Sequence, residues 1–375
     1  MGSNHRQRCP AVQRAWWPLG ALETSRSVDR RANIDWQRRL RLAPQLWSDS
    51  FGRRPMLLAG LFFGLNSAVV FLFADSLTTL LIGRILSGIS AGIFVGTATV
   101  TLIELVPGIW RDRAPAIATA ANIGGLGLGP LIAGILVEYF PQPTRLVFLV
   151  DIALLLVAAV AVLLAPETVD VAHPARPRMQ RLSIPSSVRG GFIRASIGGF
   201  AGFAVLGLFN AVSPGFISAV LDIDNHAVTG FVVFLLFASS ATAQIVVRGL
   251  DPSSAQRTEC LILVAGVVLL VLSLIIKSLP VLLASAVICG IGQGITFSYG
   301  MTTITSALPP DRRAEVTSTF FVVLYIDISV PVVGAGAAAA SWGLLNAGVV
   351  FSLAVAGVAM IAFILLTIEQ RRGRP

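Results

Sequence analysis

Long apolar segments alternate with short polar segments along most of this chain. Each apolar segment is long enough to cross a hydrocarbon core of about 30 Å at about 1.5 Å per helical residue. The ten segments cover residues 56–74, 77–103, 114–139, 145–165, 192–220, 227–247, 259–276, 280–307, 315–340 and 344–368. Inside a membrane the backbone must satisfy its own hydrogen bonds, so we expect ten helices. The pattern predicts an all-α integral membrane protein.

Composition and charge support this interpretation. The 375 residues are 55% hydrophobic and 13% charged, which is more apolar surface than a soluble domain can bury. The net charge of +9 comes from arginines that collect in the loops on the side of Arg53 and Arg54, whereas the opposite loops carry only Arg145 and Lys277. Basic loops face the cytoplasm. We therefore predict a multi-pass protein of the plasma or inner membrane with both termini cytoplasmic, and the charge requires no nucleic acid.

Polar segments divide the chain into five parts. Residues 1–48 are polar and rich in arginine, and we expect them to be disordered. Residues 49–165 form an incomplete N-terminal bundle of four spans, and a cytoplasmic linker, 166–191, follows. Residues 192–368 form a C-terminal bundle of six spans, and 369–375 form a short cytoplasmic tail.

An internal repeat relates the two bundles. A shift of 202 residues places Asp49 on Asp251 and the segment 87–93 on the segment 289–295. Two matching halves are typical of transporters built from repeats. The second half has two spans before Asp251, but no apolar span precedes Asp49. We therefore expect the first half to lack two helices, either because the start is truncated or frame-shifted or because this is a ten-helix variant.

Three motifs lie in order along the first half. The first is Asp49-x-x-Gly52-Arg53-Arg54, the second is Arg84 followed by Gly88, and the third is Gly125-x-x-x-Gly129-Pro130-x-x-Ala133-Gly134. With the spans between them, residues 46–368 resemble the major facilitator superfamily. Gln45 and Ser50 depart from the family pattern, which usually has glycine and a basic residue at these positions.

This resemblance implies a two-bundle helical fold and a secondary active transporter that works by alternating access. The third motif resembles that of proton-coupled antiporters, so we expect proton-coupled efflux of small, drug-like compounds. The implied partners are the lipid bilayer, a small-molecule substrate and protons, while a protein partner is unknown. The alternative is a truncated, non-transporting membrane fragment or scaffold.

The first motif is expected to hold the bundles together in one state. The expected gating residues are Asp49, Gly52, Arg53, Arg54 and Glu104. Gly52 permits a tight turn, and Glu104 lies on the same side of the membrane as Arg53 and is its expected partner. The alternative is that the arginines only set the topology, but topology by itself requires neither Asp49 nor Glu104.

Two charged residues inside the spans are the candidates for proton coupling. Asp327 lies in the middle of its span, and Arg84 lies about two turns inside its own. Ionisable residues within a membrane are costly and mark ion pathways. The alternative for Asp327 is a buried acid with a fixed donor, and for Arg84 it is a side chain that reaches the membrane surface.

Small and polar residues complete the candidate site. The antiporter-type motif contributes Gly125, Gly129, Pro130 and Gly134, which also permit close helix packing. The candidates that line a cavity are Asn122, Asn210, Gln244, Gln293, Tyr299 and Tyr325. Each of these polar residues can equally form hydrogen bonds between helices.

No enzymatic signature stands out. Cys9, Cys260 and Cys289 are scattered without metal-ligand spacing, as are the three histidines. The chain has no phosphate-binding loop with Gly-Lys-Ser/Thr. We therefore expect neither enzymatic activity nor a metal or cofactor, and the sequence does not identify the substrate.

Overall fold

The structure is a computed structural model that describes residues 52–167, 189–246, 252–306 and 310–372. All of these belong to one compact unit, Leu46–Pro375. The described residues form helices and no strand. Ten helices are long and apolar enough to cross a membrane, which confirms the all-α membrane fold. Asp49 and the linker beyond Glu167 lie outside the described residues.

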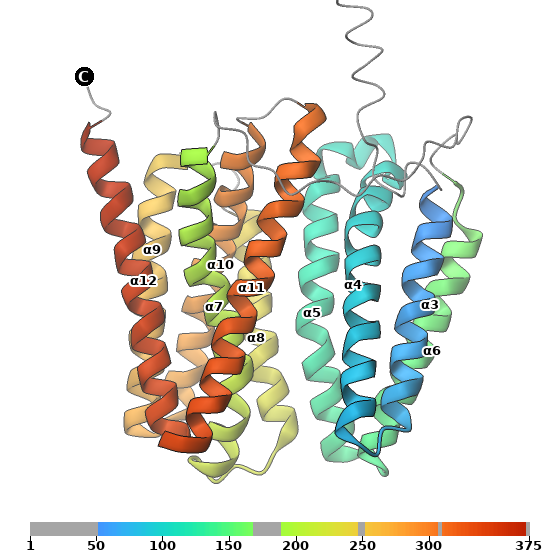
Figure 1. Ribbon diagram of the computed structural model, residues 1–375, viewed down its shortest axis with the longest axis horizontal. Helices are drawn as coiled ribbons and strands as arrows, with labels where there is room; N and C mark the ends of the chain where they lie inside the picture. The colour runs from blue at the N-terminus through green and yellow to red at the C-terminus, as the bar shows by residue number, and fades with distance from the viewer. Residues whose placement is uncertain (1–51, 168–188, 247–251, 307–309, 373–375) are drawn as a thin grey trace, which may run out of the picture. The chain divides into compact units, whose positions relative to one another are not determined.

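The helices follow the predicted spans closely (Figure 1). A short 3₁₀ helix, η2, covers Gly108–Arg113. The long helices are α3 (Arg53–Leu72), α4 (Leu77–Leu105), α5 (Ala114–Tyr139), α6 (Pro143–Leu164), α7 (Arg189–Ala219), α8 (His226–Val246), α9 (Pro252–Ile276), α10 (Leu279–Ser306), α11 (Pro310–Trp342) and α12 (Leu344–Arg372). Several extend past the apolar run because polar residues continue the helix outside the hydrocarbon core.

The second half, α7–α12, contains the main core. Helix α7 packs against α10, α11 and α12, while α8 and α9 both pack against α10. Phe209, Phe216 and Leu236 are fully buried there. The described hydrophobic clusters all centre on this half. Burial of such side chains against one another leaves the outer faces of the helices for lipid.

The first half, α3–α6, is more open. Helix α3 packs against α4 and α6, and α5 makes its most extensive contacts with α8 of the second half. The large apolar side chains Leu154, Leu156 and Val157 of α6 are exposed. Exposed apolar side chains are expected where a helix faces lipid rather than protein.

Close packing between helices depends on a few glycines. A Cβ atom on Gly290 of α10 would lie against the backbone carbonyl of Leu236 in α8, and one on Gly294 would lie against that of Ser240. These two glycines are four residues apart, so they lie on one face of α10. They let the backbones of α8 and α10 approach each other as small residues do in membrane proteins.

Candidate functional site

The beginning of α3 is held by a carboxylate from the end of the first half. The Arg53 N–H donates to Oε1 of Glu167 at 2.8 Å, and the Arg54 N–H donates to Oε2 at 3.1 Å. An anion at a helix N-terminus satisfies N–H groups that have no partner within the helix. Gly52 has a φ of 92°, and a Cβ there would lie 3.0 Å from Oε2 of Glu167. Glycine is therefore required both for the turn and for the approach.

Arg53 also joins α3 to α4. Its Nη2 lies 3.1 Å from Oε1 of Glu104, and its Nε donates to Oε2 at 3.4 Å. The Arg53 side chain is 8% exposed and that of Glu104 is 33% exposed. Arg54 donates to the backbone carbonyl of Leu163 in α6. The predicted partner of Arg53 is thus present, and these contacts tie together three helices of the first half at one end.

Sequence reasoning missed the role of Glu167. It was assigned only to the start of the linker, because its chemistry depends on α6 ending beside the beginning of α3. The segment Pro166-Glu167, directly after an apolar run, is the signal that was available. The family resemblance implies that Asp49 faces the beginning of α11, at about Glu315. Asp49 and the side chain of Glu315 lie outside the described residues, so this expected contact between the bundles stays a prediction.

A second carboxylate joins the end of α5 to the beginning of α8, on the side of the bundle opposite to Arg53. Oε2 of Glu138 accepts a hydrogen bond from the His226 N–H at 2.9 Å and lies 3.2 Å from His226 Nδ1. Asn225 Nδ2 donates to the Tyr139 hydroxyl at 3.4 Å. This contact connects the two halves. In the sequence His226 is one of three scattered histidines, and nothing local indicates that it meets Glu138.

The antiporter-type motif is divided between two environments. A Cβ atom on Gly134 would meet the backbone of His226, so this glycine lies in the α5–α8 interface. The carbonyl of Pro130 lies similarly close to Gly230 of α8. A Cβ on Gly125 or Gly129 would meet no atom within 4 Å. Only part of the motif is therefore used for packing among the described residues.

A buried polar cluster joins α8 to α10. The Ser240 hydroxyl donates to Oε1 of Gln293 at 2.5 Å, and Nε2 of Gln244 donates to the Ser240 oxygen at 3.1 Å. All three residues are at most 3% exposed. The structure thus brings together Gln244 and Gln293, two predicted cavity residues, and places them between helices.

The other polar candidates are separate from this cluster. Tyr299 is buried among residues of α8 and α9, whereas Asn210 is exposed and donates to the carbonyl of Leu206 in its own helix. Asn122 is half-buried in α5. The side chain of Tyr325 lies outside the described residues.

The two proton-coupling candidates, Arg84 and Asp327, have different environments. Arg84 is exposed on α4, with its guanidinium carbon 5.6 Å from the centre of the Phe71 ring. Asp327 is 2% exposed, and its Oδ2 has no hydrogen-bond partner. No ion pair within the described part of the chain neutralises Asp327. A carboxyl group in this setting can take up and release a proton without competing for a fixed partner.

Asp327 lines a pocket of about 440 Å³ between α7, α11 and α12. The pocket extends along α7 from Arg189 to Phe200, and Val323 and Val358 lie on its other walls. Ser196, another polar residue of the lining, was not predicted, and its hydroxyl oxygen is also buried without a partner. The spacing of Arg189, Ser196 and Phe200 on one face of a helix was the available signal.

Glu259 of α9 is a further buried acid that the sequence analysis missed. It is 3% exposed, and its Oε2 has no hydrogen-bond partner. The predicted span began at Glu259, which placed it at the membrane surface. Helix α9 instead begins at Pro252, about two turns earlier, so that Glu259 is carried into the protein. Proline suits the first helical position and was the signal for this start.

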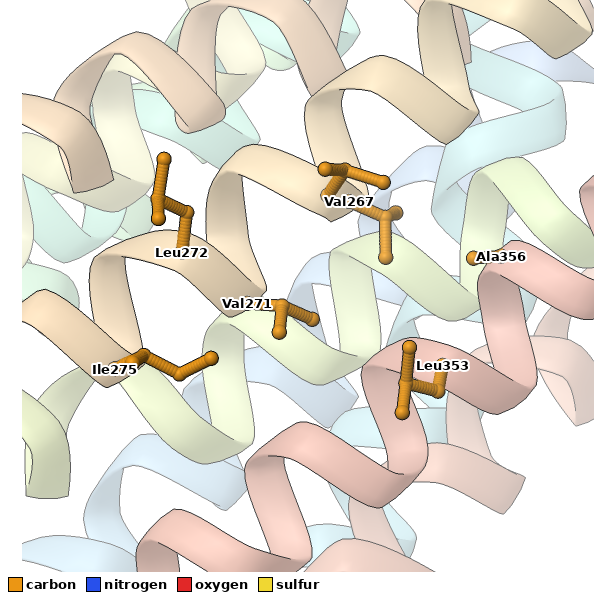
Figure 2. A pocket seen from close by; sticks show the side chains of 7 residues that line it. Val267, Val271, Leu272, Ile275, Leu353 and Ala356 are labelled. Carbon is orange, nitrogen blue, oxygen red and sulfur yellow. The ribbon is translucent and has the colours of Figure 1, made fainter.

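A second pocket, of about 260 Å³, lies between α9 and α12. Figure 2 shows the side chains of Val267, Val271, Leu272 and Ile275 from α9 with Leu353 and Ala356 from α12. All of them are apolar. This groove can hold hydrocarbon but offers no group that selects or orients a polar ligand, so the functional candidate is the pocket that contains Asp327.

The comparisons with known proteins agree with this fold. Residues 43–330 match the model of the Major Facilitator Superfamily. A 114-residue segment, 30% of this chain, is 33% identical to Multidrug resistance protein 1 of Bacillus subtilis and covers 28% of it. A 176-residue segment, 45% of this chain, is 31% identical to a triacylglyceride transporter of Mycolicibacterium smegmatis and also covers 28% of it. The chain spans less than a third of the length of these curated relatives.

Solved structures resemble the chain over a larger share. The peptide transporter POT has a TM-score of 0.62 at 13% identity, covering 88% of this chain and 82% of that one. The human organic anion transporter MFSD10 has a TM-score of 0.55 at 20% identity, covering 85% and 78%. At these identities the likeness establishes the fold alone.

Proposed function

Because the chain belongs to the Major Facilitator Superfamily, we propose that it is a secondary active transporter that exports small molecules in exchange for protons. The observation that carries the coupling is Asp327, a buried carboxyl without a partner in the middle of a membrane-spanning helix. Intramembrane acids are expensive to bury and are retained where they act. Export of drug-like compounds is supported by the similarity to the multidrug resistance protein.

The transporter works by rocking its two halves about the α5–α8 interface. The Glu138–His226 contact closes that interface at one end of the helices. At the cytoplasmic end Arg53, Arg54 and Glu104 join helices of the first half. The contact proposed there between the halves is that of Asp49, which lies outside the described residues, with the beginning of α11. Breaking one set of contacts while the other forms opens the space between the two halves alternately to the two sides of the membrane. In this arrangement both termini are cytoplasmic, in accordance with the arginine-rich loops.

Asp327 and Arg84 supply the charge that couples transport to protons. Each lies within a span, but only Asp327 lines a pocket that is large enough for a small molecule. Uptake of a proton by Asp327 removes its charge and so changes the cost of exposing it to lipid or to water. Arg84 contributes a fixed positive charge on α4 of the first half.

Proteoliposomes with an entrapped pH indicator test this proposal. Purified protein is reconstituted, and panels of amphipathic compounds are added under an imposed pH gradient. We expect compound-dependent proton flux that is lost in Asp327→Asn and reduced in Arg84→Gln. Flux that persists when both residues are neutralised contradicts the coupling, and no flux with any compound contradicts the proposed transport.

A further inference from the structure

The apolar groove between α9 and α12 covers one half of the membrane (Figure 2). Its lining on α9 runs from Val267 to Ile275, which is about 12 Å at about 1.5 Å per residue. The membrane-spanning part of α9 is Thr258–Ile276, so Val267 is its middle residue and Ile275 lies near its outer end, on the side opposite to the beginning of α3. A single leaflet supplies about half of a hydrocarbon core of about 30 Å. The groove therefore follows the path of one acyl chain of the outer leaflet.

The groove has a packed floor and an open side. Val267 is fully buried, whereas Val268, Leu272, Ile275 and Leu353 are 41–65% exposed. These exposed residues belong to the membrane-spanning parts of α9 and α12, so the open side faces lipid. All seven lining residues are apolar, and hydrocarbon can fill the groove without desolvating a polar group. The volume of about 260 Å³ gives an acyl chain more contacts than a flat helix face would.

A positive charge stands at the outer end of the groove. Lys277 directly follows α9 and is exposed. Two steps of about 3.8 Å between consecutive Cα atoms place its Cα within about 7.6 Å of the Cα of Ile275. Among the described residues no ion pair engages Lys277. Its flexible stem lets the ammonium group meet a phosphate at the membrane surface as a point charge.

The charge of the headgroup follows from the outer connections of the second half. These connections cover residues 220–225, 277–278 and 343, and Lys277 is their only lysine or arginine. Asp222 and Asp224 belong to the connection between α7 and α8, whereas α9 packs mainly against α10 and α12. An anionic headgroup is attracted to Lys277, while a zwitterionic headgroup also brings a positive charge toward it. The site therefore favours a lipid with a net negative charge.

We propose that the groove between α9 and α12 binds one anionic phospholipid. An acyl chain lies along Val267, Val271 and Ile275, and the phosphate lies at Lys277. The site is on the lipid-facing surface of the second half and is separate from the pocket beside Asp327. It goes beyond the proposed transport, because it concerns a lipid held from the membrane rather than a molecule carried across it.

Photoreactive phospholipids test the proposal in proteoliposomes of the full chain. A phosphatidylglycerol probe and a phosphatidylcholine probe carry the same acyl chains, with a diazirine near the middle of one chain, and each is added at the same low mole fraction. After illumination, peptide mass spectrometry identifies the labelled residues. We expect label within 267–275 and 353–356. The phosphatidylglycerol probe should give about fivefold more, which corresponds to about 1 kcal/mol for one lysine at a membrane surface.

Matched variants assign the label to the charge and to the groove. Lys277→Gln should remove the preference for phosphatidylglycerol, whereas Arg145→Gln, which removes the other base of the outer loops, should leave that preference unchanged. Val271→Phe should fill the groove and reduce the label from both probes. Val157→Phe adds the same bulk to the exposed face of α6, and the label in the groove should stay the same.

Three outcomes overturn the proposal. Label spread evenly over the lipid-facing residues of α6 and α9 means that the groove holds bilayer lipid only as any apolar surface does. Equal label from the two probes, or a preference that persists in Lys277→Gln with a normal unfolding temperature, removes the role of the lysine. Loss of label at a high protein-to-lipid ratio, together with dimers in native mass spectrometry, assigns the groove to a second copy of the chain. Since labelling requires no transport, an absence of proton flux contradicts only the proposed function.

Discussion

Helices α4 and α10 occupy corresponding positions in the two repeats but have different surroundings. In the membrane-spanning part of α4, 12% of the residues are buried in the protein, whereas in α10 the share is 56%. The last helices of the two halves differ in the same direction, with 0% for α6 and 28% for α12. In the second half α7 and α8 cover α10, and no described helix takes their place beside α4.

The glycines of these two helices make the comparison concrete. The 202-residue shift places Gly88 on Gly290 and Gly92 on Gly294. The pair in α10 lies against the backbone of α8, while a Cβ on either glycine of α4 would meet no atom within 4 Å. The same local pattern is therefore a close helix contact in one half and an open face in the other. A repeated sequence specifies the helix, but its neighbours decide what is buried.

The largest effect is expected when a packed glycine of α10 is replaced. Gly290→Leu forces a side chain against the α8 backbone and should destabilise the protein by about 1–3 kcal/mol or more. Gly88→Leu should change stability by less than about 0.5 kcal/mol, as surface substitutions do. Thermal unfolding of both variants in the same detergent measures the difference. Similar losses in the two variants would mean that the face of α4 is covered.

A smaller effect is expected at the beginning of α3, where the first half depends on contacts at the helix ends. Glu167→Gln keeps the shape of the side chain but removes the negative charge that receives two backbone N–H groups. We expect a loss of about 0.5–2 kcal/mol, because an anion at a helix N-terminus is worth about that much.

The control for Glu167 is Asp75→Asn, which removes an exposed acid from the connection between α3 and α4. It should leave the unfolding temperature unchanged. If both variants lower that temperature equally, then net charge rather than the contact with α3 is responsible.

The smallest effect is expected for Arg84. Its counterpart under the repeat is Ala286, which is fully buried, whereas Arg84 is exposed and contacts the Phe71 ring. A cation–π contact at an exposed site contributes about 0.5–1 kcal/mol. A double-mutant cycle with Arg84→Gln and Phe71→Leu should return a coupling energy of this size. A coupling energy near zero would show that the ring does not hold the guanidinium group.

The predicted spans matched the helices because hydrophobic runs of sufficient length have few alternatives in a membrane. The Arg53–Glu104 pair was also foreseeable, since both residues lie at helix ends on the same side of the membrane. Their positions follow from the order of the spans. Asp327 was recognised because a charge in an apolar run is conspicuous.

Contacts between distant segments were decided only by the tertiary structure. Glu167 at the beginning of α3 and Glu138 beside His226 are ordinary polar residues in sequence, and their partners lie 114 and 88 residues away. Ser196 and Glu259 acquired buried, unpaired oxygens through the way α7 and α9 pack against their neighbours. Hydropathy determined which segments enter the membrane, because that depends on composition alone. Which faces meet depends on shape and on the neighbours available, and this is why the pocket beside Asp327 was visible only in three dimensions.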